Sequence, residues 1–361
     1  MKKRIAILTG GGDCPGLNAV IRAVTKKAMF EYGMEVLGIE DGFEGLMENR
    51  FRTLRNTDVS GILTLGGTIL GTSNKVNPYR WMTEKAGKIE THDRSKEILR
   101  NIKKMRIDAL VCVGGDGTLS IADKLSKNGV PMIGVPKTID NDLYGTDITF
   151  GFDSAVSVAT DGIDRLHTTA QSHHRVMIIE VMGRNAGWIA LYAGVAGGGD
   201  IVLIPEIQYD LNKVIKKLKE RAKIGKRFSI IVVAEGAKSE DGGVVVKKIV
   251  KDSAESVRLG GVSFILADQI EQKTGIETRS VVLGHLQRGG SPTAFDRVLA
   301  TRLGARAVDM IVNKEFGFMV GVRCDGLVNT PLADVARGSR SVPLDHPLIC
   351  CARSVGTCFG D

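Results

Sequence analysis

The residues best suited to chemistry lie in loops rich in glycine and aspartate. Residues 10–16 (GGGDCPG) and residues 114–118 (GGDGT) each follow a short apolar run. Glycine lets backbone N–H groups approach an anion, and the start of a following helix adds partial positive charge. A plain tight turn remains the alternative, because residues 10–16 match neither a Walker A loop nor G-x-G-x-x-G. Asp116 in the second loop could hold Mg²⁺, which favours one or two carboxylates plus phosphate oxygens.

A third loop, residues 138–142 (TIDND), is the most acidic one. Its two carboxylates, Asp140 and Asp142, can divide the work between a base and a metal-binding or positioning group. The structural alternative is a turn in which aspartate and asparagine side chains bond their own backbone. Lys137, directly before the loop, favours phosphoryl transfer, which depends on positioning and on charge neutralisation.

Three further segments supply cations, namely residues 173–175 (HHR), 182–184 (MGR) and 284–290 (GHLQRGG). An arginine in a glycine-rich loop can bind phosphate through two parallel hydrogen bonds. Taken singly, the arginines of the first two segments would more simply form surface ion pairs, and His285 would be a structural histidine. With Arg288 three residues further on, a shared anion site becomes an equal alternative.

The elements that must position these loops alternate between strand and helix patterns. Apolar periodicity predicts helices from residue 17 to about 33 and over 119–127. Short apolar runs predict strands at 4–9, 108–113, 131–135, 176–181, 201–205, 229–234 and 280–284. This alternation predicts a parallel α/β fold, in which the loops that follow strand ends bind ligands. The main glycine and aspartate loops are such loops.

Composition excludes a fibrous or disordered protein. The chain has 361 residues, of which 44 are glycine, 43% hydrophobic and 25% charged. It lacks an apolar stretch of ~18 residues, and its first apolar run is too short for a signal peptide, so we expect a cytoplasmic protein with no membrane partner. The six cysteines follow neither a zinc nor a disulfide pattern. The last ~20 residues show few periodic features and are predicted to be a peripheral tail.

The net charge of +8 is concentrated in residues 213–227, where eight basic residues accompany Glu220 alone. Apolar residues recur there at helical spacing, which predicts a solvated helix face. An anion or nucleic-acid site is the alternative. Because no aromatic residue alternates with these lysines, stacking on single-stranded nucleic acid is disfavoured, and we expect no nucleic-acid partner.

Taken together, the loops resemble those of the 6-phosphofructokinase family over nearly the whole chain, from residue 4 to about 335. NAD kinases and lipid kinases share GGDGT but not the full series of motifs. That series comprises residues 9–18 (TGGGDCPGLN), 66–71 (GGTILG), 114–118, 136–142 (PKTIDND), 182–184, 234–236 (AEG) and 284–292 (GHLQRGGSP). The resemblance implies transfer of the γ-phosphoryl group of ATP to the 1-hydroxyl of fructose 6-phosphate, a step of glycolysis.

The same resemblance implies two Rossmann-like, three-layer α/β/α domains with mostly parallel sheets and an active site in the cleft between them. Residues 1–151 with about 287–335 would form the larger domain, which binds the phosphoryl donor. Residues 152–286 with the C-terminal tail would form the smaller domain, which binds fructose 6-phosphate.

Roles for individual residues also follow from the resemblance. Asp140 matches the general base, and Asp116 matches the carboxylate that holds Mg²⁺. The catalytic set would be Asp140, Thr138, Arg184 and Gly12. The donor-binding set would be Gly11, Gly12, Phe43, Lys75, Gly115, Asp116, Gly117, Thr118 and Lys137. The fructose 6-phosphate set would be Thr138, Asp140, Asp142, Arg175, Met182, Gly183, Arg184, Glu235, Arg279, His285 and Arg288.

Arg175 and Arg279 match arginines that reach the sugar phosphate across a subunit interface. This implies at least a dimer and commonly a homotetramer. Five further residues fall near the nucleotide effector site of bacterial relatives, which implies an allosteric enzyme. They are Arg22, Lys26, Asp200, Lys226 and Arg227.

Three positions bear on the identity of the donor, and they do not agree. In this family a glycine at position 117 leaves room for the α-phosphate of a nucleotide, whereas an aspartate fills that room in pyrophosphate enzymes. Lys137, however, belongs to the pyrophosphate type of loop, and Asn74 stands where well-known ATP enzymes carry an arginine. Lys75 or Lys137 would replace that charge. Because an aspartate would exclude the nucleotide while a lysine only adds a cation, we expect ATP. Pyrophosphate or ADP remains the alternative donor, and a non-catalytic sugar-phosphate or nucleotide sensor the alternative class.

Overall fold

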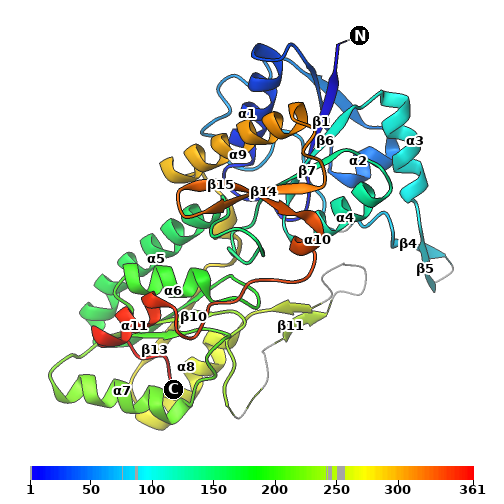
Figure 1. Ribbon diagram of the computed structural model, residues 1–361. Coiled ribbons are helices and arrows are strands. Elements are labelled where there is room, and N and C mark those ends of the chain that lie inside the picture. Colours follow the sequence, from blue (N-terminus) through cyan, green and yellow to red (C-terminus); the bar gives the residue numbers. More distant parts are fainter. Residues whose placement is uncertain (1, 75, 86–87, 241, 243–245, 250–256) are drawn as a thin grey trace.

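The computed structural model describes residues 2–74, 76–85, 88–240, 242, 246–249 and 257–361. Its larger sheet has seven strands in the order β15-β14-β7-β6-β1-β2-β3 (Figure 1). The strands are β1 (Arg4–Thr9), β2 (Glu35–Ile39), β3 (Phe51–Leu54), β6 (Ala109–Gly114), β7 (Met132–Pro136), β14 (Phe318–Arg323) and β15 (Gly326–Pro331). The five inner strands are parallel, and both edge strands are antiparallel.

A second, wholly parallel sheet has the order β13-β8-β10-β9. Its strands are β8 (Val176–Val181), β9 (Ile201–Leu203), β10 (Ser229–Ala234) and β13 (Thr278–Val282). Two antiparallel pairs lie outside both sheets: β4 (Trp81–Lys85) with β5 (Lys88–His92), and β11 (Val246–Ile249) with β12 (Val257–Leu259).

Helices accompany each sheet. With the larger sheet are α1 (Leu17–Phe30), α2 (Phe43–Glu48), α3 (Ser95–Met105), α4 (Asp116–Lys127), α9 (Ala294–Val312) and α10 (Leu332–Val335). With the second sheet are α5 (Phe152–His173), α6 (Trp188–Ala196), α7 (Leu211–Lys223), α8 (Val262–Thr274) and α11 (Pro347–Ser354), and the 3₁₀ helix η1 (Gly284–Arg288) follows β13.

Both sheets are buried on both faces, as parallel sheets usually are. In β1, Ile5 belongs to the same core cluster as residues of α1 and α9, whereas Ala6 belongs to the cluster with residues of α2, α3 and α4. In β8, Ile179 shares its cluster with α5 and α6, and Ile178 shares its cluster with α7 and α8. Two three-layer α/β/α units result, which confirms the predicted fold class. The domain boundaries stay a prediction.

The lysine-rich segment forms helix α7 and confirms the prediction of a solvated face. Val214 and Leu218 are buried, whereas Lys213, Lys216 and Lys219 are exposed. None of the helices in the described part of the chain combines the length and apolar character needed to cross a bilayer. All six cysteines lie outside disulfide bonds.

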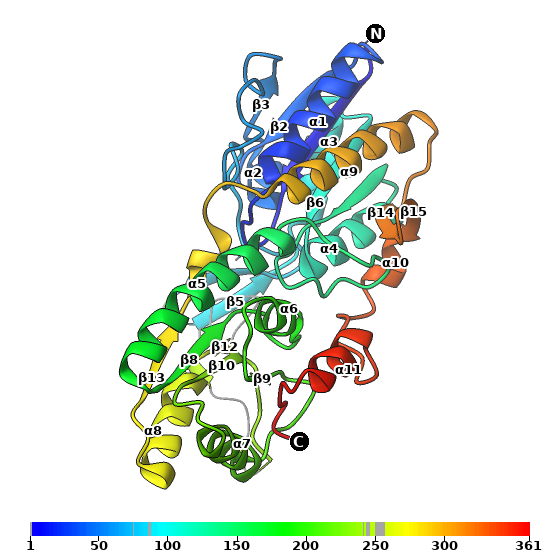
Figure 2. The ribbon, with the colours of Figure 1, turned by 90° about the vertical axis from the view of Figure 1, so that its left-hand side faces the viewer.

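The prediction of a peripheral C-terminal tail is wrong. Figure 2 shows the chain after α10 running past the larger sheet and down to α11 beside the smaller one. Cys358 forms a β-bridge with Ile201 at the edge of the second sheet, and the ring of Phe359 is fully buried. The apolar side chains that the tail buries, Val342, Ile349, Ala352 and Phe359, are few and widely spaced, so they form no periodic pattern that could have shown its packing.

Candidate active site

The glycine loop (residues 10–16) lies between β1 and α1 and is held by its neighbours. The Gly10 N–H donates to the Val113 carbonyl at 2.9 Å, and the Gly11 N–H donates to the Ser73 carbonyl at 3.1 Å. Thr72 Oγ1 donates to the Gly11 carbonyl at 2.7 Å. The N–H groups of Gly10 and Gly11 are therefore engaged within the protein. Of the three glycines, Gly12 is therefore the one whose backbone N–H is expected to contact phosphate.

Side chains from distant segments approach two glycines of this loop closely. A Cβ atom on Gly10 would lie 2.7 Å from Thr118 Cγ2, and one on Gly12 would lie 2.9 Å from Arg288 Nη1. Gly117, in the first turn of α4, is different: a Cβ atom there would meet no heavy atom within 4 Å. Gly115 caps the same helix end, where the N-terminus favours anions. Gly117 thus borders open space at a site suited to phosphate.

Two cations from distant segments converge on the glycine loop. Lys137 Nζ donates to the Gly12 carbonyl, and Arg288 Nη1 donates to the Asp13 carbonyl at 3.0 Å. Lys137 is only 3% exposed, and this burial lowers the pKa of its ammonium group. The nearby positive charge of Arg288 lowers it further, while the negative charge of Asp140 opposes the shift.

The aspartate loop (residues 137–149) follows β7. The Asp140 side chain is buried, and its backbone N–H donates to Thr138 Oγ1 at 3.1 Å. Between the two aspartates, Asn141 has a φ of 51°, a left-handed value uncommon for residues other than glycine. Asn141 Oδ1 accepts a hydrogen bond from the Thr149 N–H at 3.0 Å. Strained backbone of this kind is often found at functional sites.

Several carboxylates lie within electrostatic range of one another here. Burial raises the pKa of Asp142 to about 7, with help from the charges of Asp140 and Asp116. Arg184 opposes that shift. Burial also raises the pKa of Glu235 to about 7, and Asp140 contributes. The structure therefore brings the predicted base, metal ligand and sugar contacts within electrostatic range of one another.

The residues predicted to contact the sugar lie where β8, β10 and η1 end. The Arg184 N–H donates to Glu235 Oε1 at 3.0 Å, and the Met182 N–H donates to Gln287 Oε1 at 3.4 Å. Gly183 and Arg184 have φ values of 139° and 51°, so this turn also holds left-handed backbone. His285, on η1, is exposed.

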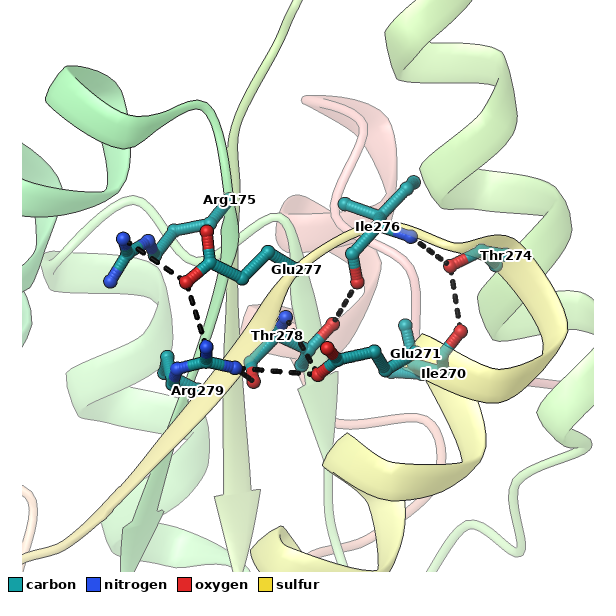
Figure 3. Close-up of polar contacts among 8 residues, drawn as sticks. All are labelled: Arg175, Ile270, Glu271, Thr274, Ile276, Glu277, Thr278 and Arg279. Carbon is teal, nitrogen blue, oxygen red and sulfur yellow. Dashed lines mark hydrogen bonds and ion pairs between the residues drawn. The ribbon is translucent and has the colours of Figure 1, made fainter.

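Arg175 and Arg279 lie apart from this cluster. Arg175 precedes β8 and Arg279 is near the start of β13, whereas Met182–Arg184 follow the far end of β8, which is about 20 Å long at ~3.3 Å per residue. Both arginines form an ion pair with Glu277, and Arg279 also pairs with Glu271 (Figure 3). The nitrogen–oxygen distances are 3.2 Å for Arg175–Glu277, 2.8 Å for Arg279–Glu277 and 3.4 Å for Arg279–Glu271. Within one chain neither arginine belongs to the site, and their reach across a subunit interface stays a prediction.

One predicted donor contact is placed differently, and another is not described. Phe43, the first residue of α2, is only 4% exposed and belongs to a core cluster with Leu46 and Leu119. It therefore offers little ring surface to an adenine. Lys75 lies outside the described residues.

One residue at the site was missed by sequence reasoning. Arg340, from the tail, donates through Nη2 to the carbonyls of Asn141 and Asp147, at 3.0 and 2.8 Å. A single arginine in a segment without periodicity gives no signal that could have found it.

Among the described residues, no three His, Cys, Asp or Glu side chains gather as a metal-binding group. Mg²⁺ does not require such a cage, because it keeps several waters and binds one or two carboxylates plus substrate phosphates. Asp116 is exposed at the start of α4, and its Oδ1 accepts from the Gly117 N–H at 2.7 Å. This donor set, with Asp142 nearby, fits that pattern.

Comparisons with known proteins found relatives that match nearly the whole chain. An ATP-dependent 6-phosphofructokinase 2 from Clostridium perfringens is 53% identical over 99% of both chains. A pyrophosphate–fructose 6-phosphate 1-phosphotransferase from Amycolatopsis mediterranei is 48% identical over 95% of this chain and 97% of that one. Among solved structures, Pichia pastoris phosphofructokinase in the T-state is 33% identical with a TM-score of 0.80, over 93% of this chain and 36% of that longer chain.

The profile of the phosphofructokinase family matches residues 4–311. Together with full-length relatives at about half identity, this match confirms the family that the motifs predicted and the enzyme class that comes with it. The chain belongs to the phosphofructokinase family.

Proposed function

We propose that this chain is an ATP-dependent 6-phosphofructokinase, which converts fructose 6-phosphate and ATP to fructose 1,6-bisphosphate and ADP in glycolysis. The observation that carries this proposal is the set of Asp116, Asp140 and Asp142, in which Asp142 lies within electrostatic range of the other two and of Arg184. Lys137, which donates to the glycine loop, lies within electrostatic range of Asp140. Phosphoryl transfer needs such positioning and charge neutralisation more than covalent chemistry. The names of the full-length relatives support both substrates.

In the proposed reaction, Asp140 accepts the proton of the sugar 1-hydroxyl. The hydroxyl oxygen forms a bond to the γ-phosphorus as the bond from that phosphorus to the β,γ-bridging oxygen breaks. The Thr138 hydroxyl fixes the Asp140 backbone through the hydrogen bond described above. Arg184 lines the sugar and transition-state side, Gly12 contacts the phosphates, and Asp142 assists beside the base.

Two features support ATP over pyrophosphate as the donor. The open space beside Gly117 can receive an α-phosphate. Lys137, the residue typical of pyrophosphate enzymes, already donates to the Gly12 carbonyl and is almost fully buried, so its charge is engaged within the protein. Because one relative at 48% identity is a pyrophosphate enzyme, pyrophosphate remains the alternative donor to be tested.

Mg²⁺ fits the carboxylate cluster. Burial, followed by the charges of Asp140 and Asp116, raises the pKa of Asp142, and a cation would relieve the repulsion between these carboxylates. Asp116 would hold the metal, and Asp142 lies near enough to assist. When bound, Mg²⁺ neutralises charge on the donor phosphates.

We further propose a homotetramer, or at least a dimer, in the cytoplasm. The position of Arg175 and Arg279 far from their own site supports a role in the site of another copy. Asp200, one of the expected effector residues, pairs with Arg221 at 2.7 Å and accepts from the Ile230 N–H. An effector acting there would have to engage this ion pair. Sedimentation velocity tests the assembly, since a monomer at assay concentration would contradict it.

A donor panel tests the proposed function. ATP, ADP and pyrophosphate are each supplied with fructose 6-phosphate, with Mg²⁺ and with EDTA, and fructose 1,6-bisphosphate is measured. We expect rapid formation of fructose 1,6-bisphosphate only when ATP is the donor and Mg²⁺ is present. Turnover only with pyrophosphate would transfer the assignment to the alternative donor. If the protein binds fructose 6-phosphate but forms no product with any of the three donors, the alternative of a non-catalytic sensor would be favoured.

A further inference from the structure

The C-terminal tail runs from α10, with the larger sheet, to α11, beside the smaller one (Figure 2), and it contacts the aspartate loop on the way. Ser339 forms an antiparallel bridge with Leu143, within the aspartate loop. Three residues further on, the Val342 N–H donates to Glu206 Oε1 at 2.8 Å. The tail therefore contacts the base-bearing loop and the smaller sheet unit within four residues.

Arg340 lies between these two contacts and holds the backbone on both sides of Asp142. Its N–H donates to the Asp142 carbonyl at 2.5 Å, and its Nη2 donates to the Asn141 and Asp147 carbonyls. The Asn141 carbonyl belongs to the peptide that precedes Asp142, and the Asp142 carbonyl to the peptide that follows it. Hydrogen bonds to a charged donor are stronger than neutral ones, so Arg340 can help to hold Asn141 in its left-handed conformation.

The other face of Arg340 packs on the smaller sheet unit. Its guanidinium lies 4.5 Å from the centre of the Trp188 ring, and Trp188 Nε1 donates to the Arg340 carbonyl at 3.2 Å. Trp188 is buried at the first position of α6, four residues after Arg184 in the connection from β8. Arg340 thus joins the loop that carries the proposed base to the segment that carries the proposed transition-state arginine.

We propose that Arg340 is a positioning residue for phosphoryl transfer, which sets the aspartate loop against the β8–α6 connection from the C-terminal tail. This inference rests on the proposed function. Arg340 touches neither substrate in this proposal and acts through the backbone of Asn141 and Asp142. It also lies beyond residues 4–311, the part of the chain that the family profile matches.

Two tail arginines give a matched test. Arg353 also lies over an aromatic ring, that of Phe359 at 5.2 Å, and pairs with Asp361, but its described contacts do not reach the aspartate loop. We expect Arg340→Met to lower kcat at least tenfold while each KM changes less than threefold. Arg353→Met should keep kcat within twofold of wild type. Arg340→Lys should recover part of the loss, because an ammonium can still donate to two carbonyls.

Hydrogen exchange supplies a readout that does not depend on catalysis. We expect amides of residues 138–149 to exchange at least fivefold faster in Arg340→Met, or in Arg340→Lys if the first variant does not fold, than in Arg353→Met. Unchanged exchange, or a kcat equal to that of wild type, would overturn the positioning role. Wild-type protein inactive with ATP and fructose 6-phosphate would refute the proposed function instead, and exchange would still decide the role of Arg340.

Discussion

Replacing Gly117 by aspartate tests how the donor is chosen. The glycine is exposed in the first turn of α4, and a side chain there meets open space. Aspartate is a better helix former than glycine by a few tenths of a kcal/mol, and an acid in the first turn is favourable by about 0.3–1 kcal/mol. The variant should therefore fold, with a Tm within about 3 °C of wild type.

The effect on ATP should be large. The new carboxylate would occupy the space proposed for the α-phosphate and face its negative charge. Two unit charges ~4 Å apart at an effective dielectric constant of ~20 repel by about 4 kcal/mol. We therefore expect kcat/KM for ATP to fall by about 10³-fold, since 1.4 kcal/mol corresponds to a factor of ten.

The assay measures fructose 1,6-bisphosphate formed with ATP and with pyrophosphate, in the presence of Mg²⁺. Gly117→Ala is the matched control, because it adds a Cβ atom without the carboxylate, and it should keep kcat/KM for ATP within tenfold of wild type. If Gly117→Asp retains ATP activity within threefold of wild type, the α-phosphate does not lie beside residue 117 and the argument for a nucleotide donor fails.

Three further outcomes are expected. Asp140→Asn should keep substrate affinity but lower kcat by roughly 10²–10⁴, the usual contribution of a general base; wild-type turnover would contradict the assignment. Asp142→Asn should raise the Tm of the ligand-free protein at pH 8 in EDTA but not near pH 4.5. Burial raises the folded-state pKa of Asp142 to about 7, so the wild-type protein loses stability as the pH rises from about 4 to 7. A gain in Tm that does not depend on pH would contradict this explanation. Rates measured with and without ADP or phosphoenolpyruvate should differ if the chain is allosteric, and identical rates would count against an effector site.

Much of the fold and of the site could be predicted from the sequence. Strand β6 and the GGDGT segment after it are visible as a buried apolar run that ends in glycine, because burial on both faces and close backbone approach each restrict residue type locally. The same local restriction placed Asp116, Asp140 and Asp142 after strand ends, and the order of the motifs identified the family.

Other features depend on contacts that no local pattern records. The ring of Phe43 lies in the core, since its neighbours come from segments far away in the chain. Lys137 is predicted from the sequence as a donor contact, and only the structure shows that it donates to the Gly12 carbonyl, 125 residues away. A phenylalanine or a lysine can face either a ligand or the protein interior. The residue type does not distinguish these two environments, so only the packing does.

The sequence by itself therefore determined the α/β class, the family and the chemistry-bearing loops, because each depends on residue types at short spacing. Only the tertiary structure decided that Arg175 and Arg279 lie at the sheet end away from the site and that the tail reaches the aspartate loop through Arg340. The hydrogen bonds of Arg340 join residues almost 200 positions apart to backbone carbonyls, which every residue has. Hydrogen bonds to backbone carbonyls do not require particular side chains in the loop, so the sequence of the loop does not reveal them.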